Sequence, residues 1–193
     1  MLPQHVQASP ATDVLSRAVT KLKGYKSITA SYAISGAEGV ENGVIVVDQR
    51  RFLIDSPGMK VWYDGKTQWT FLPQEKEVTV TEPAADELRQ INPFAVIEGY
   101  SGNYEATLLK STEPGKSVVE LKPRGGRSND GISRAVVTFD SSTLLPEKVV
   151  LTMSSRSVVT IRISSLTDSG KQNPARFKPH PNQFPGCEVI DLR

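Results

Sequence analysis

The sequence predicts a mainly β (α+β) protein, an unclosed and strongly curved antiparallel β-barrel of about ten or eleven strands with an N-terminal helix and a central helical lid. Three observations predict this fold. Hydrophobic residues follow a helical period near the N-terminus and then alternate with polar residues through most of the chain. Turn-forming residues separate the alternating runs at hairpin length. One helical stretch interrupts the strands, and a sheet of this size needs a cover or a closure.

The length sets the domain organisation. A chain of 193 residues is long enough for one core and short for two. We therefore expect residues 1–11 to be a disordered or processed N-terminal segment and residues 12–193 to form one domain.

The first element is an amphipathic helix over residues 12–23. Thr12 is the expected N-cap, and Asp13 lies at the positive end of the helix dipole. Gly24 follows the last turn as the expected C-cap. The apolar side chains that share one face are Val14, Leu15, Ala18, Val19 and Leu22.

The strands follow in two blocks. The expected strands are residues 28–34, 44–48, 51–55, 59–63, 67–72 and 76–81 before the interruption, and 103–110, 117–122, 132–139, 147–154 and 157–164 after it. Asn42-Gly43 and Asp64-Gly65 are expected turns, and Asp64-Gly65 is the strongest hairpin signal. Brief extended pieces are expected at 176–178 and 188–191.

The interruption, residues 82–99, is the expected lid. Residues 82–90 are typical of a short helix with acidic residues in its early turns. Asn92 is the expected N-cap of a second helix with Pro93 at its first position. Phe94 and Ile97 are three residues apart and share a face of that helix.

Composition excludes several classes of function. The net charge is +2, and a dedicated nucleic-acid binder has a larger, clustered excess of Lys and Arg. The single cysteine, Cys187, excludes an internal disulfide and a thiolate metal cage. With two histidines, a hydrolase using His180 is a remote alternative, because a His between prolines is typical of a surface loop. We expect no enzymatic activity, no catalytic residue, no metal and no cofactor.

The compartment is not set by the first residues. They lack the basic region and the apolar region of a signal peptide, and no apolar run approaches the roughly 20 residues that cross a bilayer. Either the protein is cytoplasmic or a leader has been removed.

Several short strings together resemble the periplasmic outer-membrane lipoprotein carrier (LolA) family. The similar strings are residues 27–32, residues 43–47 followed by Arg51-Phe52 and Pro57, residues 64–69 followed by Phe71 and Pro73, Asn92-Pro93-Phe94, and Phe184-Pro185-Gly186 with Ile190-Asp191. The most specific of them is residues 64–69, Asp-Gly-Lys-Thr-Gln-Trp. The resemblance spans nearly the whole chain.

The resemblance implies a fold and a function. It implies an unclosed barrel whose helices cover an apolar cavity, and a monomeric periplasmic carrier that holds the acyl chains of lipoproteins. Its expected partners are an inner-membrane release complex and an outer-membrane receptor, besides the acylated lipoprotein or lipid itself. In many members an Arg shortly before a strand Phe ties the lid shut. Here Phe52 takes the Phe position, and Arg50, next to Arg51, is the candidate latch.

The expected acyl-chain-binding residues combine the resemblance with the alternation of apolar side chains. They are Phe52, Ile54, Trp69, Phe71, Leu108, Val149 and Leu151 from the sheet, with Phe94 and Ile97 from the lid. The alternatives are a related half-barrel lipid receptor or envelope-stress sensor domain, and a protein-interaction module whose interior is filled. The interior volume distinguishes the module from a carrier.

Overall fold

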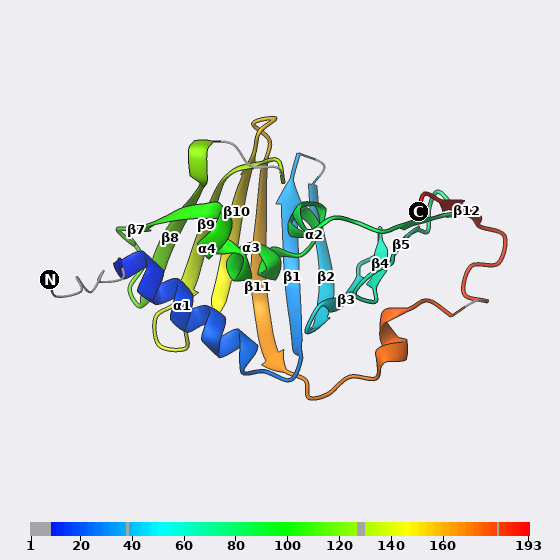
Figure 1. Ribbon diagram of the computed structural model, residues 1–193, viewed down its shortest axis with the longest axis horizontal. Helices are drawn as coiled ribbons and strands as arrows, with labels where there is room; N and C mark the ends of the chain where they lie inside the picture. The colour runs from blue at the N-terminus through cyan, green and yellow to red at the C-terminus, as the bar shows by residue number, and fades with distance from the viewer. Residues whose placement is uncertain (1–8, 38, 127–129, 181) are drawn as a thin grey trace, which may run out of the picture.

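The structure is a computed structural model that describes residues 9–37, 39–126, 130–180 and 182–193 (Figure 1). Its strands form one 12-stranded sheet in the order β12-β6-β5-β4-β3-β2-β1-β11-β10-β9-β8-β7. The first six strands are β1 (Ile28–Gly36), β2 (Gly39–Asp48), β3 (Arg51–Asp55), β4 (Lys60–Tyr63), β5 (Gln68–Leu72) and β6 (Glu77–Thr81). The others are β7 (Tyr104–Leu109), β8 (Lys116–Pro123), β9 (Ile132–Asp140), β10 (Pro146–Met153), β11 (Val158–Asp168) and β12 (Glu188–Asp191).

The predicted fold class is confirmed: the protein is mainly β, with an unclosed curved sheet, an N-terminal helix and short central helices. The brief extended piece predicted at 188–191 is β12, the twelfth strand. It pairs with β6 in parallel, which differs from the predicted antiparallel sheet; the other neighbouring pairs are antiparallel. The strands β12 and β7 are the two edges.

Helix α1 (Pro10–Lys23) begins two residues earlier than predicted. The N-cap is Ser9, not Thr12, and the Ser9 side chain accepts a hydrogen bond from the Thr12 backbone N–H at 3.2 Å. Pro10 fits the first turn because the N–H that it lacks would have no partner there. Ala11, Leu15, Ala18 and Leu22 are buried, and they form the face that packs on the sheet. Residues 1–8 of the predicted N-terminal segment lie outside the described residues.

The lid consists of α2 (Ala85–Ile91), α3 (Pro93–Glu98) and α4 (Tyr100–Asn103). The Asn92 side chain accepts the Phe94 N–H at 3.0 Å, so the predicted N-cap is confirmed. The segment connects β6 to β7, which lie at opposite ends of the sheet order. It must therefore cross one face of the sheet, and Figure 1 shows it on the same face as α1. We call this face the inner face and the opposite one the outer face.

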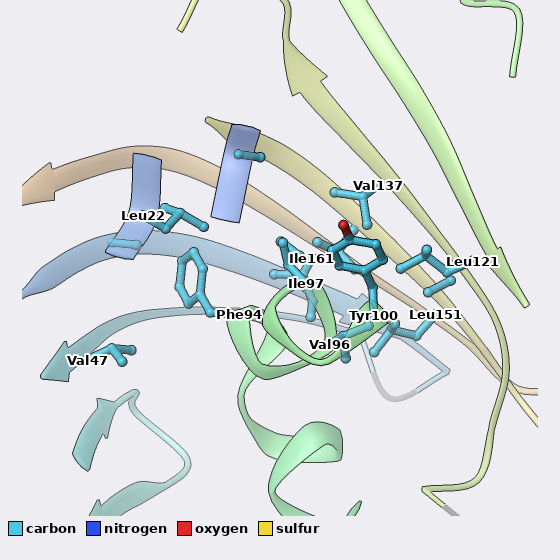
Figure 2. Packing of buried hydrophobic residues seen from close by; sticks show 14 of the residues in the cluster. Leu22, Val47, Phe94, Val96, Ile97, Tyr100, Leu121, Val137, Leu151 and Ile161 are labelled. Carbon is cyan, nitrogen blue, oxygen red and sulfur yellow. The ribbon is translucent and has the colours of Figure 1, made fainter. Parts of the chain in front are cut away.

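The main core lies between the inner face and the helices. Phe94, Val96 and Ile97 of α3 are at most 1% exposed, and Tyr104 at the start of β7 is fully buried. Figure 2 shows the lid side chains pointing between Leu22 and the sheet residues Val137, Leu151 and Ile161.

A second, smaller core lies on the outer face. Val46, Leu53 and Trp62 are covered by Phe177 of the 3₁₀ helix η2 (Pro174–Phe177), with Trp69, Phe71 and Phe184 around them. The prediction of an extended piece at 176–178 is therefore wrong, because Pro174–Phe177 forms a 3₁₀ helix. The turn forms because Asn173 accepts the Ala175 N–H at 3.0 Å and Pro174 occupies its first position. We call residues 173–180 and 182–187, whose Phe177 and Phe184 cover the outer face of β2 to β5, the strap.

The predicted turn at Asn42-Gly43 is also wrong, because both residues lie inside β2. The chain reverses between Gly36 and Gly39 instead. Gly43 pairs with Tyr32 on β1, and a Cβ at position 43 would lie 2.5 Å from the Tyr32 hydroxyl oxygen. The Tyr32 ring thus occupies the space that a side chain at position 43 would need, and glycine is required in the strand.

The predicted hairpin at Asp64-Gly65 is confirmed between β4 and β5. The Asp64 carboxylate accepts the backbone N–H groups of Lys66 at 3.0 Å and Thr67 at 2.9 Å, and Gly65 has a φ of 102°.

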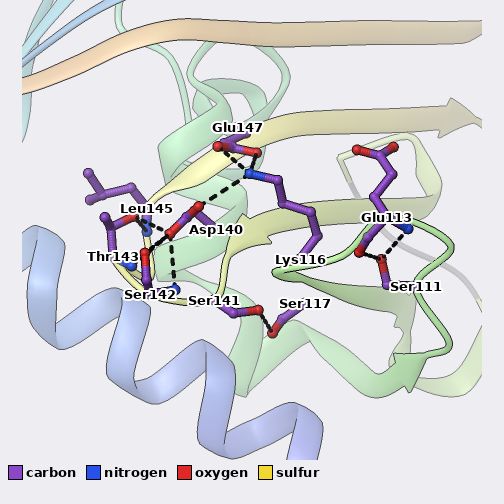
Figure 3. A network of polar contacts seen from close by, with 10 residues as sticks. All are labelled: Ser111, Glu113, Lys116, Ser117, Asp140, Ser141, Ser142, Thr143, Leu145 and Glu147. Atoms are coloured by element: carbon purple, nitrogen blue, oxygen red, sulfur yellow. Dashed lines mark hydrogen bonds and ion pairs between the residues drawn. The ribbon is translucent and has the colours of Figure 1, made fainter.

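At the other end of the sheet, a polar network fixes the loop between β9 and β10 (Figure 3). The Asp140 carboxylate accepts the N–H groups of Ser142 and Thr143. Lys116 of β8 donates to Asp140 at 3.2 Å and to Glu147 of β10 at 2.8 Å. One lysine therefore joins three neighbouring strands.

Candidate functional site

An apolar cavity of about 280 Å³ lies between the inner face and the lid. It is lined by Tyr32 and Ile34 of β1, Glu41 and Ile45 of β2, Ile54 of β3, Ser56, Met59, Val61 of β4, Thr70 of β5, Ile91 of α2 and Ile161 of β11. Its volume is just below the range for small-molecule sites, roughly 300–1,000 Å³.

Strand register explains why these residues share one cavity. Directly paired residues on neighbouring antiparallel strands present their side chains to the same face. One row runs from Ile161 through Ile34 to Glu41, and a second from Ile45 through Ile54 to Val61 and Thr70. The cavity floor therefore consists of two cross-strand rows, with Ile91 of α2 as the roof.

A more open groove of about 720 Å³ adjoins the cavity at the end of the β1–β2 hairpin. The groove and the cavity share Ile34 and Glu41. These two residues mark the junction between the cavity and the more open groove.

The polar groups of the cavity are fixed by their own partners. Glu41 accepts the Gly58 backbone N–H at 2.8 Å, and the Ser56 hydroxyl donates to the Met59 carbonyl at 2.9 Å. The Thr70 hydroxyl accepts from the Gln68 side-chain amide at 3.1 Å. Burial, with the negative charges of Glu41 and Asp55, raises the pKa of Tyr32 to about 12, so its phenol stays neutral.

A buried ion pair ties the lid to the opposite half of the sheet. Arg89 of α2 donates to the Asp130 carboxylate at 2.7 Å, and the Tyr104 hydroxyl donates to the same oxygen at 2.5 Å. The Asp130 side chain is 1% exposed and that of Arg89 is 15% exposed. Burial and the bond to Asp130 raise the pKa of Tyr104, so the phenol remains the donor. Arg89 lies two residues before Ile91, and the pair therefore holds the roof of the cavity.

Arg50, the predicted latch, does not line the cavity under α2. It is exposed in the turn after β2 and borders a second cavity of about 290 Å³ together with Glu98 at the end of α3. Among the described residues no ion pair joins Arg50 to Glu98. Arg51 pairs with Asp48 at 3.2 Å and lies over the Phe177 ring, so it contacts the strap rather than the lid. A latch at Arg50 stays a prediction.

The structure does not bring the nine predicted acyl-chain residues together. Of them, only Ile54 lines the apolar cavity under α2. Five others are buried in the main core between the inner face and the helices: Phe52, Phe94, Ile97, Val149 and Leu151. Leu108 is 44% exposed on the edge strand β7. Trp69 and Phe71 lie in the outer core against Phe184 of the strap. Acyl-chain binding by any of them stays a prediction.

The cavity residues that sequence reasoning missed include Tyr32, Ile34, Ile45, Val61 and Ile161. A signal for them exists in the alternation, because each lies at an apolar position of a predicted strand. Alternation alone does not say which face of a strand the helices cover. The ion pair of Arg89 with Asp130 joins residues 41 positions apart and leaves no local pattern.

The groups considered for catalysis or metal binding are not assembled into a site. His180 is exposed, and its ring Nδ1 accepts the Asn182 N–H at 3.3 Å. Within the described residues, His, Cys, Asp and Glu nowhere form a group of three or more that could hold a metal ion. No helix in that same part of the chain combines the length and apolar character needed to cross a bilayer.

Comparison with solved structures shows a shared fold. An uncharacterized conserved protein from Thermus thermophilus aligns with a TM-score of 0.62 and 13% identity over 95% of this chain and 99% of its own. A DUF1329 family protein from Desulfovibrio piger aligns with a TM-score of 0.54 and 15% identity, over 89% of this chain and 98% of its own. A putative outer membrane lipoprotein-sorting protein domain from Vibrio parahaemolyticus aligns with a TM-score of 0.50 and 14% identity, over 86% of this chain and 95% of its own.

Comparison at the level of sequence identifies the family. No curated protein matches the sequence. The family described as outer membrane lipoprotein carrier protein LolA matches residues 4–148, which include the first nine strands and the whole lid. The chain therefore belongs to the family of the outer membrane lipoprotein carrier protein LolA.

Proposed function

We propose that this protein is a periplasmic carrier that binds an acyl chain of a lipoprotein non-covalently in the cavity under α2. It would receive the lipoprotein from an inner-membrane release complex and deliver it to an outer-membrane receptor. The observation that carries the proposal is the apolar cavity of about 280 Å³ with an open groove at its end. Family membership supports it.

The volume suits one chain segment. At roughly 30 Å³ per methylene, about the share of a water molecule in the liquid, the cavity takes about nine methylenes. Each methylene removed from water contributes about 0.8 kcal/mol, so the segment gains about 7 kcal/mol. Immobilising the chain and ordering the side chains offset much of this gain. The resulting modest affinity suits a carrier, which must also release its cargo.

The lid accounts for entry and exit. Ile91 closes the cavity from α2, and α2 is a helix of two turns. One tie between α2 and the rest of the protein is the ion pair of Arg89 with Asp130. Opening the roof therefore requires movement of one short segment, while the cross-strand rows of the floor stay in place.

A cavity-blocking variant tests the proposal. Ile34 lies at the junction of cavity and groove, so Ile34→Trp should obstruct the path of a chain. Val44→Trp is the matched control, because Val44 is 38% exposed on the neighbouring strand and does not line the cavity. Binding of a neutral fluorescent acyl probe is measured by titration, with circular dichroism as the check on folding.

We expect one saturable site in the wild type and in Val44→Trp, and at least about tenfold weaker binding in Ile34→Trp, which corresponds to about 1.4 kcal/mol. Absence of saturable binding in the wild type would refute the carrier proposal. It would favour the protein-interaction module, the alternative that needs no ligand.

A further inference from the structure

The cavity carries one kind of charge. Among the described residues that line it, Glu41 is the only ionisable side chain other than the Tyr32 phenol, and none is Lys, Arg or His. Glu41 lies at the junction with the open groove. An acyl chain inserted from the groove into the cavity would leave its head group near this carboxylate.

The position of Glu41 is fixed by the chain around it. Its Oε1 accepts the Gly58 N–H at 2.8 Å, and a Cβ on Gly58 would lie 2.9 Å from that oxygen. Glycine at position 58 therefore allows the carboxylate to approach the backbone. Register places Glu41 opposite Ile34 on the inner face.

Within the part of the chain that the structure describes, Glu41 forms no ion pair. Asp55 is paired with Lys60 at 2.7 Å, and Lys60 lies over the Trp62 ring of the outer core. The Lys60 side chain is thus directed toward the outer face. The raised pKa of Tyr32 has the same origin, since Glu41 and Asp55 both disfavour a phenolate beside the cavity.

We propose that Glu41 sets the head-group specificity of the cavity, which accepts acyl chains in ester or amide linkage and rejects free fatty-acid anions. A bound carboxylate would lie beside a second carboxylate in a partly desolvated place, whereas an ester or amide carries no charge. The Tyr32 hydroxyl supplies a neutral donor for the carbonyl oxygen of such a linkage. This inference rests on the proposed function, because it assumes that the acyl chain enters this cavity.

Competition among probes with one tail and different heads tests it. Nile red, a neutral fluorophore, is bound first and then displaced by monolaurin (ester), lauramide (amide) or laurate (anion) at neutral pH. We expect monolaurin and lauramide to displace Nile red with similar midpoints. Laurate should require about tenfold higher concentration, the effect of one like-charge contact near a protein surface.

Variants at Glu41 identify the cause. Glu41→Gln should reduce the difference between laurate and monolaurin to about twofold or less, and Glu41→Lys should reverse it. Asp13→Asn is the control, because it also removes one carboxylate, Asp13 is 58% exposed on α1 and it does not line the cavity; this variant should keep the wild-type ratio. Circular dichroism confirms folding, and the two Glu41 variants provide independent tests if one of them fails to fold.

The outcomes separate the two proposals. Equal displacement by all three probes in the wild type, or an unchanged ratio in Glu41→Gln and Glu41→Lys, would overturn the role of Glu41 and leave the carrier proposal standing. Displacement by none of the probes would contradict the carrier proposal itself, and this inference with it.

Discussion

Removing one member of the buried ion pair of Arg89 with Asp130 should destabilise the protein and loosen the lid. In Arg89→Met the Asp130 carboxylate, 1% exposed, keeps the Tyr104 hydroxyl and the Ile132 N–H but loses the Arg89 guanidinium. Removing one partner of a buried ion pair costs about 3–5 kcal/mol. Since Arg89 retains 15% exposure, we expect about 3 kcal/mol, or roughly 6–12 °C in Tm for a domain of this size.

A double-mutant cycle isolates the pair. Asp130→Asn removes the carboxylate that pairs with the Arg89 guanidinium, and Arg89→Met/Asp130→Asn removes both charges of the pair. The double variant should be more stable than the sum of the single losses predicts, by about 1.5–3 kcal/mol. Arg17→Met is the control, because the pair of Arg17 with Asp13 is more than half exposed and should contribute less than about 0.5 kcal/mol.

The assays are urea unfolding followed by circular dichroism and hydrogen exchange of residues 85–103. In either single variant, exchange of the α2 and α3 amides should become faster than in the wild type, because the lid loses this ion pair. Exchange of the β9 and β10 amides should change less, because the hydrogen bonds between the strands remain. Single losses that add within about 0.5 kcal/mol would refute the coupling. Unchanged exchange in the lid would refute the role of the Arg89–Asp130 ion pair in holding the lid.

Three further changes test the fold around the site. Gly43→Ala should displace the Tyr32 ring and crowd the Asp55 carbonyl, destabilising the protein by about 1–3 kcal/mol in thermal unfolding; Tyr32→Ala should relieve part of that loss, and no relief would contradict the contact. Although burial acts to raise the pKa of Asp64, the N–H groups of its hairpin and the Lys178 ammonium outweigh it and hold that pKa below the usual 3.8. The strap contact is therefore present at neutral pH and lost only as the pH falls through this lowered pKa, which Trp fluorescence should report in the wild type and not in Asp64→Asn. Phe52, 2% exposed, packs on Tyr63 with ring centroids 5.1 Å apart, so Phe52→Glu should abolish cooperative unfolding rather than weaken binding alone; a folded variant would contradict this placement.

The strand pattern was predictable from the sequence because side chains along each strand alternate between the inner face and the outer face, which faces solvent or the strap. Turn chemistry located the hairpin at Asp64-Gly65 for a local reason, since its carboxylate caps its own turn. The same reasoning failed at Asn42-Gly43, where the decisive contact comes from Tyr32 on the neighbouring strand. Local chemistry is thus sufficient only where the stabilising partner is also local.

The candidate site was harder to predict because face assignment depends on what covers each face. Trp69 and Phe71 alternate correctly, yet they lie on the outer face, which Phe177 and Phe184 of the strap cover. Nothing in the alternation distinguishes a strap from a lid. Ile54 lines the cavity because the helices cover its face of β3, where it joins Ile45 and Val61 in one cross-strand row.

Photo-crosslinking tests most directly whether an acyl chain occupies the space under α2. A monoacylglycerol with a diazirine at the end of its chain is bound, irradiated, and its attachment sites are mapped by peptide mass spectrometry. The account predicts labels on Ile54, Val61 or Ile91 that unlabelled monolaurin suppresses. Saturable labelling of Trp69 and Phe184 in the outer core instead would show that the ligand binds the other face of the sheet.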